Sequence, residues 1–204
     1  MLIGLDFDNT IVCYDRAIAT LAEEFPSLPA DVPRTKLGLR EHLRATGREA
    51  EWTAFQGTLY GPGMQHAEPF PGAIETMQAL QTAGHRLVIV SHRSLRPYAG
   101  PPHDLHAAAR GWVIERLQSA GLFCSDGKGS PINFLETREA KVATIAQLGC
   151  KVFVDDLPEV LEAPAFPAGT VGILFDPLQE LAQPAIQHRV SAWNELPALL
   201  ANLQ

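Results

Sequence analysis

Short apolar runs alternate with helical patterns along most of this 204-residue chain. The runs have the usual length of β-strands, and they lie at residues 2–7, 86–91, 132–135, 151–154 and 171–175. The helical patterns between them stop at Gly84, Gly121 and Gly149, and glycine suits the position just past a helix C-terminus. Strands that alternate with helices imply right-handed crossovers and a parallel sheet covered on both faces. The sequence therefore predicts a doubly wound α/β fold.

The first apolar run ends in two carboxylates, Asp6 and Asp8. Residues i and i+2 of an extended strand face the same side, so these two like charges repel unless a cation lies between them or one carboxyl is protonated. The pair favours a divalent-metal site or acid–base chemistry. This segment alone leaves an alternative open, in which the acids lie in a turn with Asn9 and Thr10 as turn and cap formers.

A second apolar run, residues 152–154, also ends in two acids, Asp155 and Asp156. Because the carboxyl ends of parallel strands meet at one edge of the sheet, we expect these side chains beside Asp6 and Asp8. Such a group of carboxylates offers the hard oxygen ligands that Mg²⁺ prefers. The alternative is that Asp155 or Asp156 only caps the following turn.

Two further polar residues are expected at the same edge. Ser91 ends the run Leu87–Val90, where its hydroxyl could donate a hydrogen bond to an anionic group, although without the other motifs a turn-forming serine is the favoured interpretation. Lys141 lies about one turn inside a helix that begins near Thr137, and helical side chains lean toward the helix N-terminus. Its ammonium could therefore balance the carboxylates and a substrate phosphate. The alternative for Lys141 is a solvated surface position.

Residues 15–69 interrupt the alternation, because they contain helical patterns and no convincing strand. The patterns lie at 15–25, 33–46 and 48–60, with proline- and glycine-bearing breaks between them. We expect a core domain formed by residues 1–14 and 70–204, with 15–69 as a helical insertion. A second insert-like segment, residues 94–106, is expected to be an ordered loop.

Composition excludes several classes of function. The chain has 16 Lys and Arg against 23 Asp and Glu, a net charge of −7, which argues against a nucleic-acid polymer or an anionic membrane as a partner. Its 3 cysteines have no CxxC spacing, so neither a disulfide framework nor a zinc site is indicated. No run approaches the roughly 18 apolar residues of a membrane helix. We expect a cytoplasmic protein, a monomer or a homodimer.

The motifs described above occur in an order that resembles the haloacid dehalogenase (HAD) superfamily. They are Asp-x-Asp-x-Thr at residues 6–10, the strand-end Ser91, the helix residue Lys141 and the strand-end pair Asp155-Asp156. The resemblance spans residues 2–159 and includes Pro71-Gly72, a helix start that usually follows the first cap insertion of the family. It implies a Rossmann-like core and a small helical cap over residues 15–69, which would limit substrates to small molecules.

The resemblance also implies a chemistry for the first motif. Asp6 would attack phosphorus and form an aspartyl-phosphate, while Asp8 would protonate the leaving oxygen and then activate the hydrolytic water. Dehalogenase members lack an acid two residues after the nucleophile, because a halide leaves without a proton. The presence of Asp8 therefore favours the phosphatase branch.

The remaining motif residues would bind the metal and the substrate. The expected metal ligands are Asp6, the backbone carbonyl of Asp8, Asp156 and Asp155. Ser91 and Lys141 would bind the transferring phosphoryl oxygens and so complete the catalytic set of Asp6, Asp8, Ser91 and Lys141. The expected substrate-binding residues lie in the loops after the two motif strands: Asn9, Thr10, His92 and Arg93.

Two departures from the family pattern leave details open. His92 and Arg93 follow the motif serine where a small residue is often found, and they either shape the substrate pocket or pack in the core. The acidic motif Asp155-Asp156 is followed by Glu159, and not by an acid at the spacing seen in many members. Which of Asp155 and Asp156 binds the metal directly is therefore left open.

We therefore predict an Mg²⁺-dependent phosphomonoester hydrolase that acts on a small phosphorylated metabolite. Within the same superfamily, a phosphotransferase or a nucleotidase is the alternative. A non-catalytic protein on an inherited phosphatase fold is a second alternative. A signalling receiver module also places acids, a hydroxyl and a lysine around Mg²⁺, but such modules are shorter and lack an inserted cap.

Overall fold

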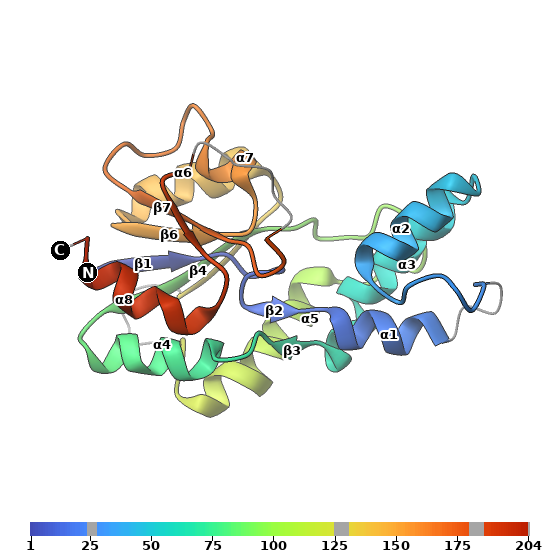
Figure 1. Cartoon of the computed structure of the whole chain (residues 1–204), viewed down its shortest axis with the longest axis horizontal. Coiled ribbons are helices and arrows are strands. Elements are labelled where there is room, and N and C mark those ends of the chain that lie inside the picture. Colours follow the sequence, from blue (N-terminus) through green and yellow to red (C-terminus); the bar gives the residue numbers. More distant parts are fainter. Residues whose placement is uncertain (24–27, 125–130, 180–185, 204) are drawn as a thin grey trace. The chain divides into compact units, whose positions relative to one another are not determined.

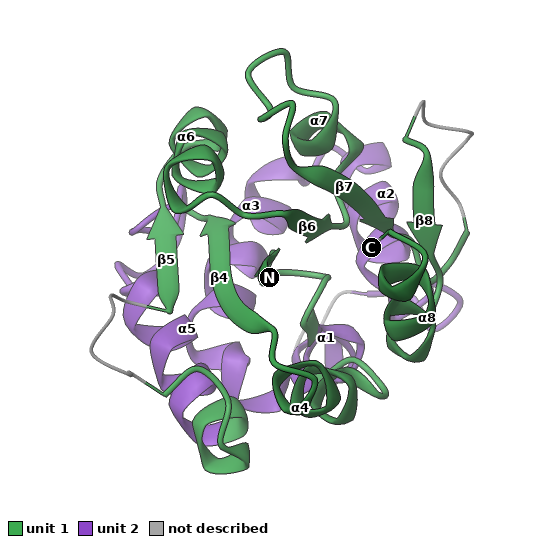
Figure 2. Cartoon of the chain, turned by 90° about the vertical axis from the view of Figure 1, so that its left-hand side faces the viewer, with its two compact units in different colours: residues 1–12, 69–93, 116–204 green, residues 13–68, 94–115 purple. Residues whose placement is uncertain are grey.

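The structure, a computed structural model, describes residues 1–23, 28–124, 131–179 and 186–203 (Figure 1). The chain folds into two compact units, coloured separately in Figure 2. Unit 1 consists of residues 1–12, 69–93 and 116–204, and unit 2 consists of residues 13–68 and 94–115.

Unit 1 contains a six-stranded sheet. Its strands lie in the order β5 (Ile132–Leu135), β4 (Arg86–His92), β1 (Leu2–Leu5), β6 (Val152–Asp155), β7 (Val171–Phe175) and β8 (His188–Val190). Every neighbouring pair is parallel. The chain proceeds outward from β1 to β4 and β5 on one side, and through β6, β7 and β8 on the other. The predicted doubly wound parallel fold is confirmed, and the strand order reverses at β1, where ligands bind in such folds.

Helices cover both faces of this sheet. Figure 2 shows α6 (Arg138–Leu148) and α7 (Pro158–Leu161) over one face, with α4 (Ala73–Thr82) and α8 (Leu196–Ala201) over the other. The core beneath α6 joins Val142 and Ile145 to Val90 and Phe153 of the sheet, all buried. Burial of these apolar side chains on both faces explains why the strands read as continuous apolar runs.

Local signals account for most element boundaries in unit 1. The Thr137 hydroxyl accepts a hydrogen bond from the Ala140 N–H at 3.1 Å and so caps the start of α6. The helix ends at Gly149, whose φ of 68° is readily adopted by glycine. The edge strand β8 was not predicted, because it has 3 residues and only one of them, Val190, is buried.

Unit 2 is helical. Its elements are α1 (Asp15–Glu23), α2 (Lys36–Ala45), α3 (Glu49–Tyr60), the 3-10 helix η1 (Pro62–His66) and α5 (Leu105–Trp112). A π-helical turn, η2 (Val113–Leu117), and a short 3-10 helix, η3 (Gln118–Ala120), continue α5 along the chain. Leu39, Leu43, Trp52, Phe55 and Leu59 are buried here. Among the described residues, no helix has the length and hydrophobicity of a membrane span.

The second insert-like segment differs from the expectation in two respects. The first is that residues 94–115 group with the helical unit. A Cβ added to Gly57 of α3 would lie 2.8 Å from Pro97 Cβ, so the loop after residue 94 packs closely on α3. The Asp104 carboxylate accepts a hydrogen bond from the Ala107 N–H and starts α5 at Leu105, inside the segment expected to be a loop.

A two-stranded sheet joins β2 (Val12–Cys13) to β3 (Glu68–Pro69), where the chain passes between the units. Each of these strands is too short to give an apolar pattern.

Candidate active site

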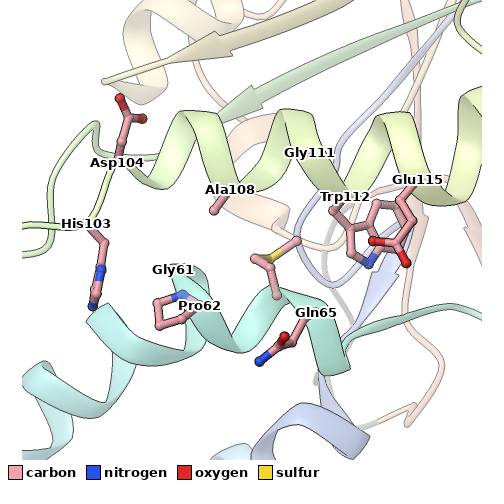
Figure 3. A pocket seen from close by; sticks show the side chains of 10 residues that line it. Gly61, Pro62, Gln65, His103, Asp104, Ala108, Gly111, Trp112 and Glu115 are labelled. Atoms are coloured by element: carbon pink, nitrogen blue, oxygen red, sulfur yellow. The ribbon is translucent and has the colours of Figure 1, made fainter.

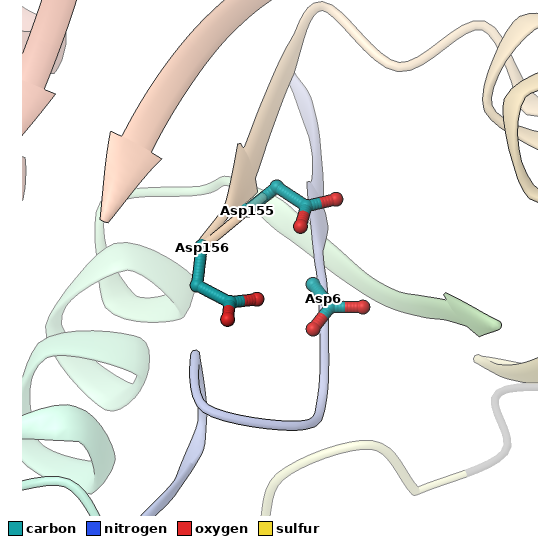
Figure 4. Close-up of side chains that lie close together, drawn as sticks. All are labelled: Asp6, Asp155 and Asp156. Carbon is teal, nitrogen blue, oxygen red and sulfur yellow. The ribbon is translucent and has the colours of Figure 1, made fainter. Parts of the chain in front are cut away.

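Three carboxylates meet at the carboxyl ends of β1 and β6, the neighbouring strands at the reversal of strand order. Asp6 follows β1 directly, and its N–H donates to the Val154 carbonyl at 2.9 Å, which holds it beside β6. Asp155 ends β6, and Asp156 comes next. One oxygen from each of Asp6, Asp155 and Asp156 lies within 4.8 Å of the others (Figure 4). Asp6 and Asp155 are 3% and 0% exposed, so this acidic cluster is largely removed from water.

Lys141 of α6 lies against the acidic cluster. Its Nζ is 2.6 Å from Asp6 Oδ1 and 2.6 Å from Asp155 Oδ2. The side chain is fully buried rather than solvated, and the ammonium lies 5.5 Å from the centre of the Phe153 ring. Burial alone would lower the pKa of Lys141, but the charges of Asp6 and Asp155 outweigh burial and raise it. Lys141 is therefore a fixed positive charge at this site.

Asp155 carries the clearest electrostatic cost. Its Oδ1 accepts a hydrogen bond from the Leu157 N–H at 3.0 Å, whereas Oδ2 makes no hydrogen bond of suitable direction despite its short ion pair with Lys141. Burial raises the pKa of Asp155 to about 7; the charge of Asp6 adds to this rise, and Lys141 opposes it. The raised pKa of Asp155 is therefore mainly a consequence of its burial.

The loop after Asp6 reverses the chain and presents Asp8. The N–H groups of Ile11 and Val12 both donate to the Phe7 carbonyl, and Asn9 has a φ of 59° in the left-handed region, which asparagine tolerates well. The Thr10 side chain is fully buried, and its carbonyl accepts a hydrogen bond from Trp193 Nε1 at 3.0 Å. Asn9 and Thr10 therefore shape the loop, and their contact with substrate stays a prediction.

The other neighbour of β1 is β4, and the predicted residues at its end are Ser91 and His92 within the strand and Arg93 directly after it. Ser91 is 1% exposed and lies opposite Phe134 in the sheet register. Burial and then the charge of Lys141 lower the pKa of His92, while Asp6 and Asp8 act in the opposite direction, so this ring lies within electrostatic reach of the cluster. Arg93 is buried, with its Nη1 3.4 Å from Asp8 Oδ1.

The comparisons with solved structures agree with this architecture. A dehalogenase is 16% identical and matches 98% of this chain and 96% of its own, with a TM-score of 0.57. A predicted phosphoglycolate phosphatase from Haemophilus somnus 129pt is 15% identical, with 98% and 97% covered and a TM-score of 0.58. The putative HAD-hydrolase YfnB from Bacillus subtilis, in a magnesium-bound form, is 14% identical, with 98% and 97% covered and a TM-score of 0.55.

The chain has the haloacid dehalogenase-like fold. The predicted HAD-like core is thereby confirmed. No protein-family model matches the sequence, and a search of curated proteins finds no relative.

Within this HAD-like fold, the acidic cluster fits a divalent cation. Asp6, Asp155 and Asp156 each bring one oxygen within 4.8 Å of the others, and the Lys141 ammonium pairs with Asp6 and Asp155. All the donors are oxygens, which suits a hard cation such as Mg²⁺. The buried Oδ2 atom of Asp155 accepts no hydrogen bond, which fits a place beside a bound cation.

The sequence reasoning missed one acidic residue at the same sheet edge. Asp176 directly follows β7, is 5% exposed and pairs with Arg189 of β8. The signal was the same as for the other acids, an apolar run that ends in aspartate. Arg189 compensates the charge of Asp176, so this ion pair links the end of β7 to the neighbouring strand β8.

Unit 2 contains a pocket of about 360 Å³ (Figure 3). Its buried lining includes Met64 and Trp112, and its exposed lining includes Gln65, Asp104 and Glu115. The Trp112 Nε1–H donates to the Ala67 carbonyl at 3.0 Å, which fixes the indole in place. Figure 3 shows that η1 and α5 supply the two walls.

Proposed function

We propose that this protein is a phosphomonoester hydrolase of the HAD superfamily that depends on a divalent cation, Mg²⁺ by preference, and acts on a small phosphorylated metabolite. The observation that carries the proposal is the cluster of Asp6, Asp155 and Asp156, in which the Lys141 ammonium pairs with the two buried acids, Asp6 and Asp155. Asp8 lies two residues after Asp6. It combines a nucleophile, a cation site and an acid at the switch point of a parallel sheet.

The residues that would hold the cation are Asp6, Asp156 and the backbone carbonyl of Asp8, with Asp155 beside them. When bound, the cation would neutralise the carboxylates and the phosphate so that two anions can approach each other. Lys141 contributes a second, permanent positive charge, because its Nζ lies 2.6 Å from Asp6 and is closed off from water. We assign Lys141 and Ser91 to the oxygens of the transferring phosphoryl group.

The reaction would then proceed in two steps on this chain's own side chains. An oxygen of Asp6 attacks phosphorus, the bond from phosphorus to the leaving oxygen breaks, and Asp8 donates its proton to that oxygen. Asp8, now a carboxylate, accepts a proton from water as the water oxygen attacks the phosphorus of the aspartyl-phosphate. The bond from phosphorus to Asp6 breaks, and phosphate leaves with Asp6 and the protonated Asp8 restored.

Asp8 supports phosphate over halide as the group released. The dehalogenase and the predicted phosphatase resemble this chain equally well, with TM-scores of 0.57 and 0.58, so fold does not separate the two chemistries. An alkoxide is a poor leaving group and needs a proton, whereas a halide does not. A carboxylic acid two residues after the nucleophile therefore favours phosphoester hydrolysis.

We also propose that residues 15–69, all of which except Pro69 belong to unit 2, act as a cap that admits small substrates. The net charge of −7 supports a soluble metabolite rather than a nucleic-acid polymer or membrane lipid as partner. A cytoplasmic location and a monomeric or homodimeric state belong to the same proposal.

A substrate panel tests the function directly. Purified protein is incubated with sugar phosphates, nucleotides and phosphorylated acids, and phosphate release is measured with Mg²⁺, with Ca²⁺ and with EDTA. We expect release from a subset of substrates with Mg²⁺ and none with EDTA, restored by excess Mg²⁺. If no substrate releases phosphate with any cation, the hydrolase proposal fails.

A further inference from the structure

Arg93 occupies an unusual position beside the proposed acid. Its side chain is 5% exposed although guanidinium groups are rarely buried without partners. It directly follows β4, and its N–H donates to the Leu135 carbonyl of β5 at 2.7 Å, so its backbone is anchored to the sheet. The side chain therefore starts from a fixed point at the carboxyl edge.

Two aromatic rings lie beside the guanidinium. Arg93 Cζ lies 5.7 Å from the centre of the Phe7 ring and 5.9 Å from that of Phe134. The two rings themselves pack edge to face, with centres 5.3 Å apart. A planar guanidinium suits a place beside this ring pair, because it is attracted to aromatic faces and is less strongly hydrated than an ammonium. The rings restrict where the charged end can point.

That charged end meets Asp8. The distance from Arg93 Nη1 to Asp8 Oδ1 is 3.4 Å, and the Asp8 side chain remains 19% exposed. At that separation the attraction is that of an ion pair more than of a short hydrogen bond. One side of the carboxyl is therefore drawn toward a rigid cation, while the group as a whole stays within reach of a ligand.

An apolar side chain would pack beside two phenyl rings without the cost of desolvating a charge. We propose that Arg93 is a positioning residue that orients the Asp8 carboxyl for proton transfer. This rests on the proposed function, in which Asp8 protonates the leaving oxygen and deprotonates water. Proton transfer requires a heavy-atom approach of hydrogen-bond length, so a misdirected carboxyl slows it sharply.

A double-mutant cycle tests this role. The variants are Arg93→Met, Asp8→Asn and the double variant, assayed on the best alkyl phosphate of the substrate panel. We expect Arg93→Met to lower kcat by about 10- to 100-fold with KM changed by less than about 3-fold. In the Asp8→Asn background the same change should alter kcat by less than about 2-fold, because the residue through which Arg93 acts is gone.

The leaving group provides an independent readout. p-Nitrophenyl phosphate releases an anion that needs no proton, so formation of the aspartyl-phosphate, measured as a burst of p-nitrophenolate, should be nearly unchanged in Arg93→Met. Arg93→Lys keeps the charge without the planar fork and should give an intermediate loss of kcat on the alkyl phosphate. If Arg93→Met does not fold, Arg93→Lys takes its place in the cycle.

The outcomes separate the two proposals. Equal losses from Arg93→Met with and without Asp8, or a loss in KM alone, would overturn the positioning role while leaving the phosphatase active. A burst lost to the same extent as alkyl-phosphate turnover would also overturn it. A wild-type protein without cation-dependent phosphate release defeats the proposed function, and the role of Arg93 falls with it.

Discussion

The acidic cluster of unit 1 and the pocket of unit 2 handle charge in opposite ways. In the cluster, Lys141 and Asp6 pair across 135 residues of sequence, with side chains that are 0% and 4% exposed. In unit 2, Arg16 pairs with Glu68 while 72% and 39% exposed, and the acids that line the pocket are exposed as well. Charge is buried in one region and solvated in the other.

This difference has an energetic meaning. Exposed ion pairs contribute little to stability, because water and salt screen them. Buried charges carry a large desolvation cost, so a fold retains them where their chemistry is needed or where a partner is always present. The comparison supports our proposal that unit 1 carries the chemistry.

Removal of the nucleophile should produce the greatest contrast. We expect Asp6→Asn to lower kcat by about 10⁴-fold, because an amide cannot form the acyl phosphate. The matched control is Glu41→Gln on the exposed surface of α2, which should stay within about 2-fold of wild type. Steady-state phosphate release measures both. Comparable activity in the two variants would show that Asp6 is not the nucleophile.

Removal of the basic side chain from each ion pair should change the stability of the protein by different amounts. Lys141→Met leaves Asp6 and Asp155 facing each other in a buried site, and breaking a buried pair typically costs about 3–5 kcal/mol. Arg16→Met in unit 2 should leave the melting temperature nearly unchanged. Thermal denaturation without divalent cations compares them. A similar melting temperature for both variants would contradict the distinction between the two regions.

The cluster should also couple stability to pH through Asp155. Its pKa is raised to about 7, so burial of this carboxyl favours the folded state at low pH, and that contribution is lost as pH rises through 7. A divalent cation binds the deprotonated form. The increase in melting temperature on adding Mg²⁺ should therefore grow from pH 5 to pH 8. At a Mg²⁺ concentration of 100 times the Kd, binding raises the free energy of unfolding by about 2.7 kcal/mol.

Asp155→Asn provides the control for this titration. Without the carboxyl, the increase in stability with Mg²⁺ should depend much less on pH over the same interval. Differential scanning calorimetry at several pH values measures the effect. An increase that is equally large at pH 5 and pH 8 in wild type would mean that Asp155 does not titrate in this range.

Much of unit 1 could be predicted because its signals are local. Apolar runs located β1, β4, β5, β6 and β7, and glycines located the ends of α4 and α6. Acids that follow two of those strands indicated a cluster, since parallel topology alone brings such ends together. The structure places Asp6, Asp155 and Asp156 in that relation, with Lys141 beside them.

What the sequence did not reveal depends on contacts between distant segments. Phe7, Arg93 and Phe134 come together only after three strands have paired, and no spacing in the sequence relates them. The inclusion of residues 94–115 in unit 2 likewise depends on packing against α3. The strand β8 is too short to have a periodicity of its own.

The smallest predicted effect compares glycines in the two units. A Cβ at Gly4 of β1 would lie 2.4 Å from Phe153 Cδ2 and 3.0 Å from Cys150 Sγ, both in the core of unit 1. Gly4→Ala should therefore destabilise the protein by about 1–3 kcal/mol, because a packed interior cannot absorb an added methyl group.

A Cβ at Gly111 of α5, on the pocket wall, has no atom within 4 Å. Gly111→Ala should stabilise the protein by about 0.5–1 kcal/mol through helix propensity. Urea denaturation measures both, and a loss of stability in Gly111→Ala would show that the pocket wall is as closely packed as the core of the sheet.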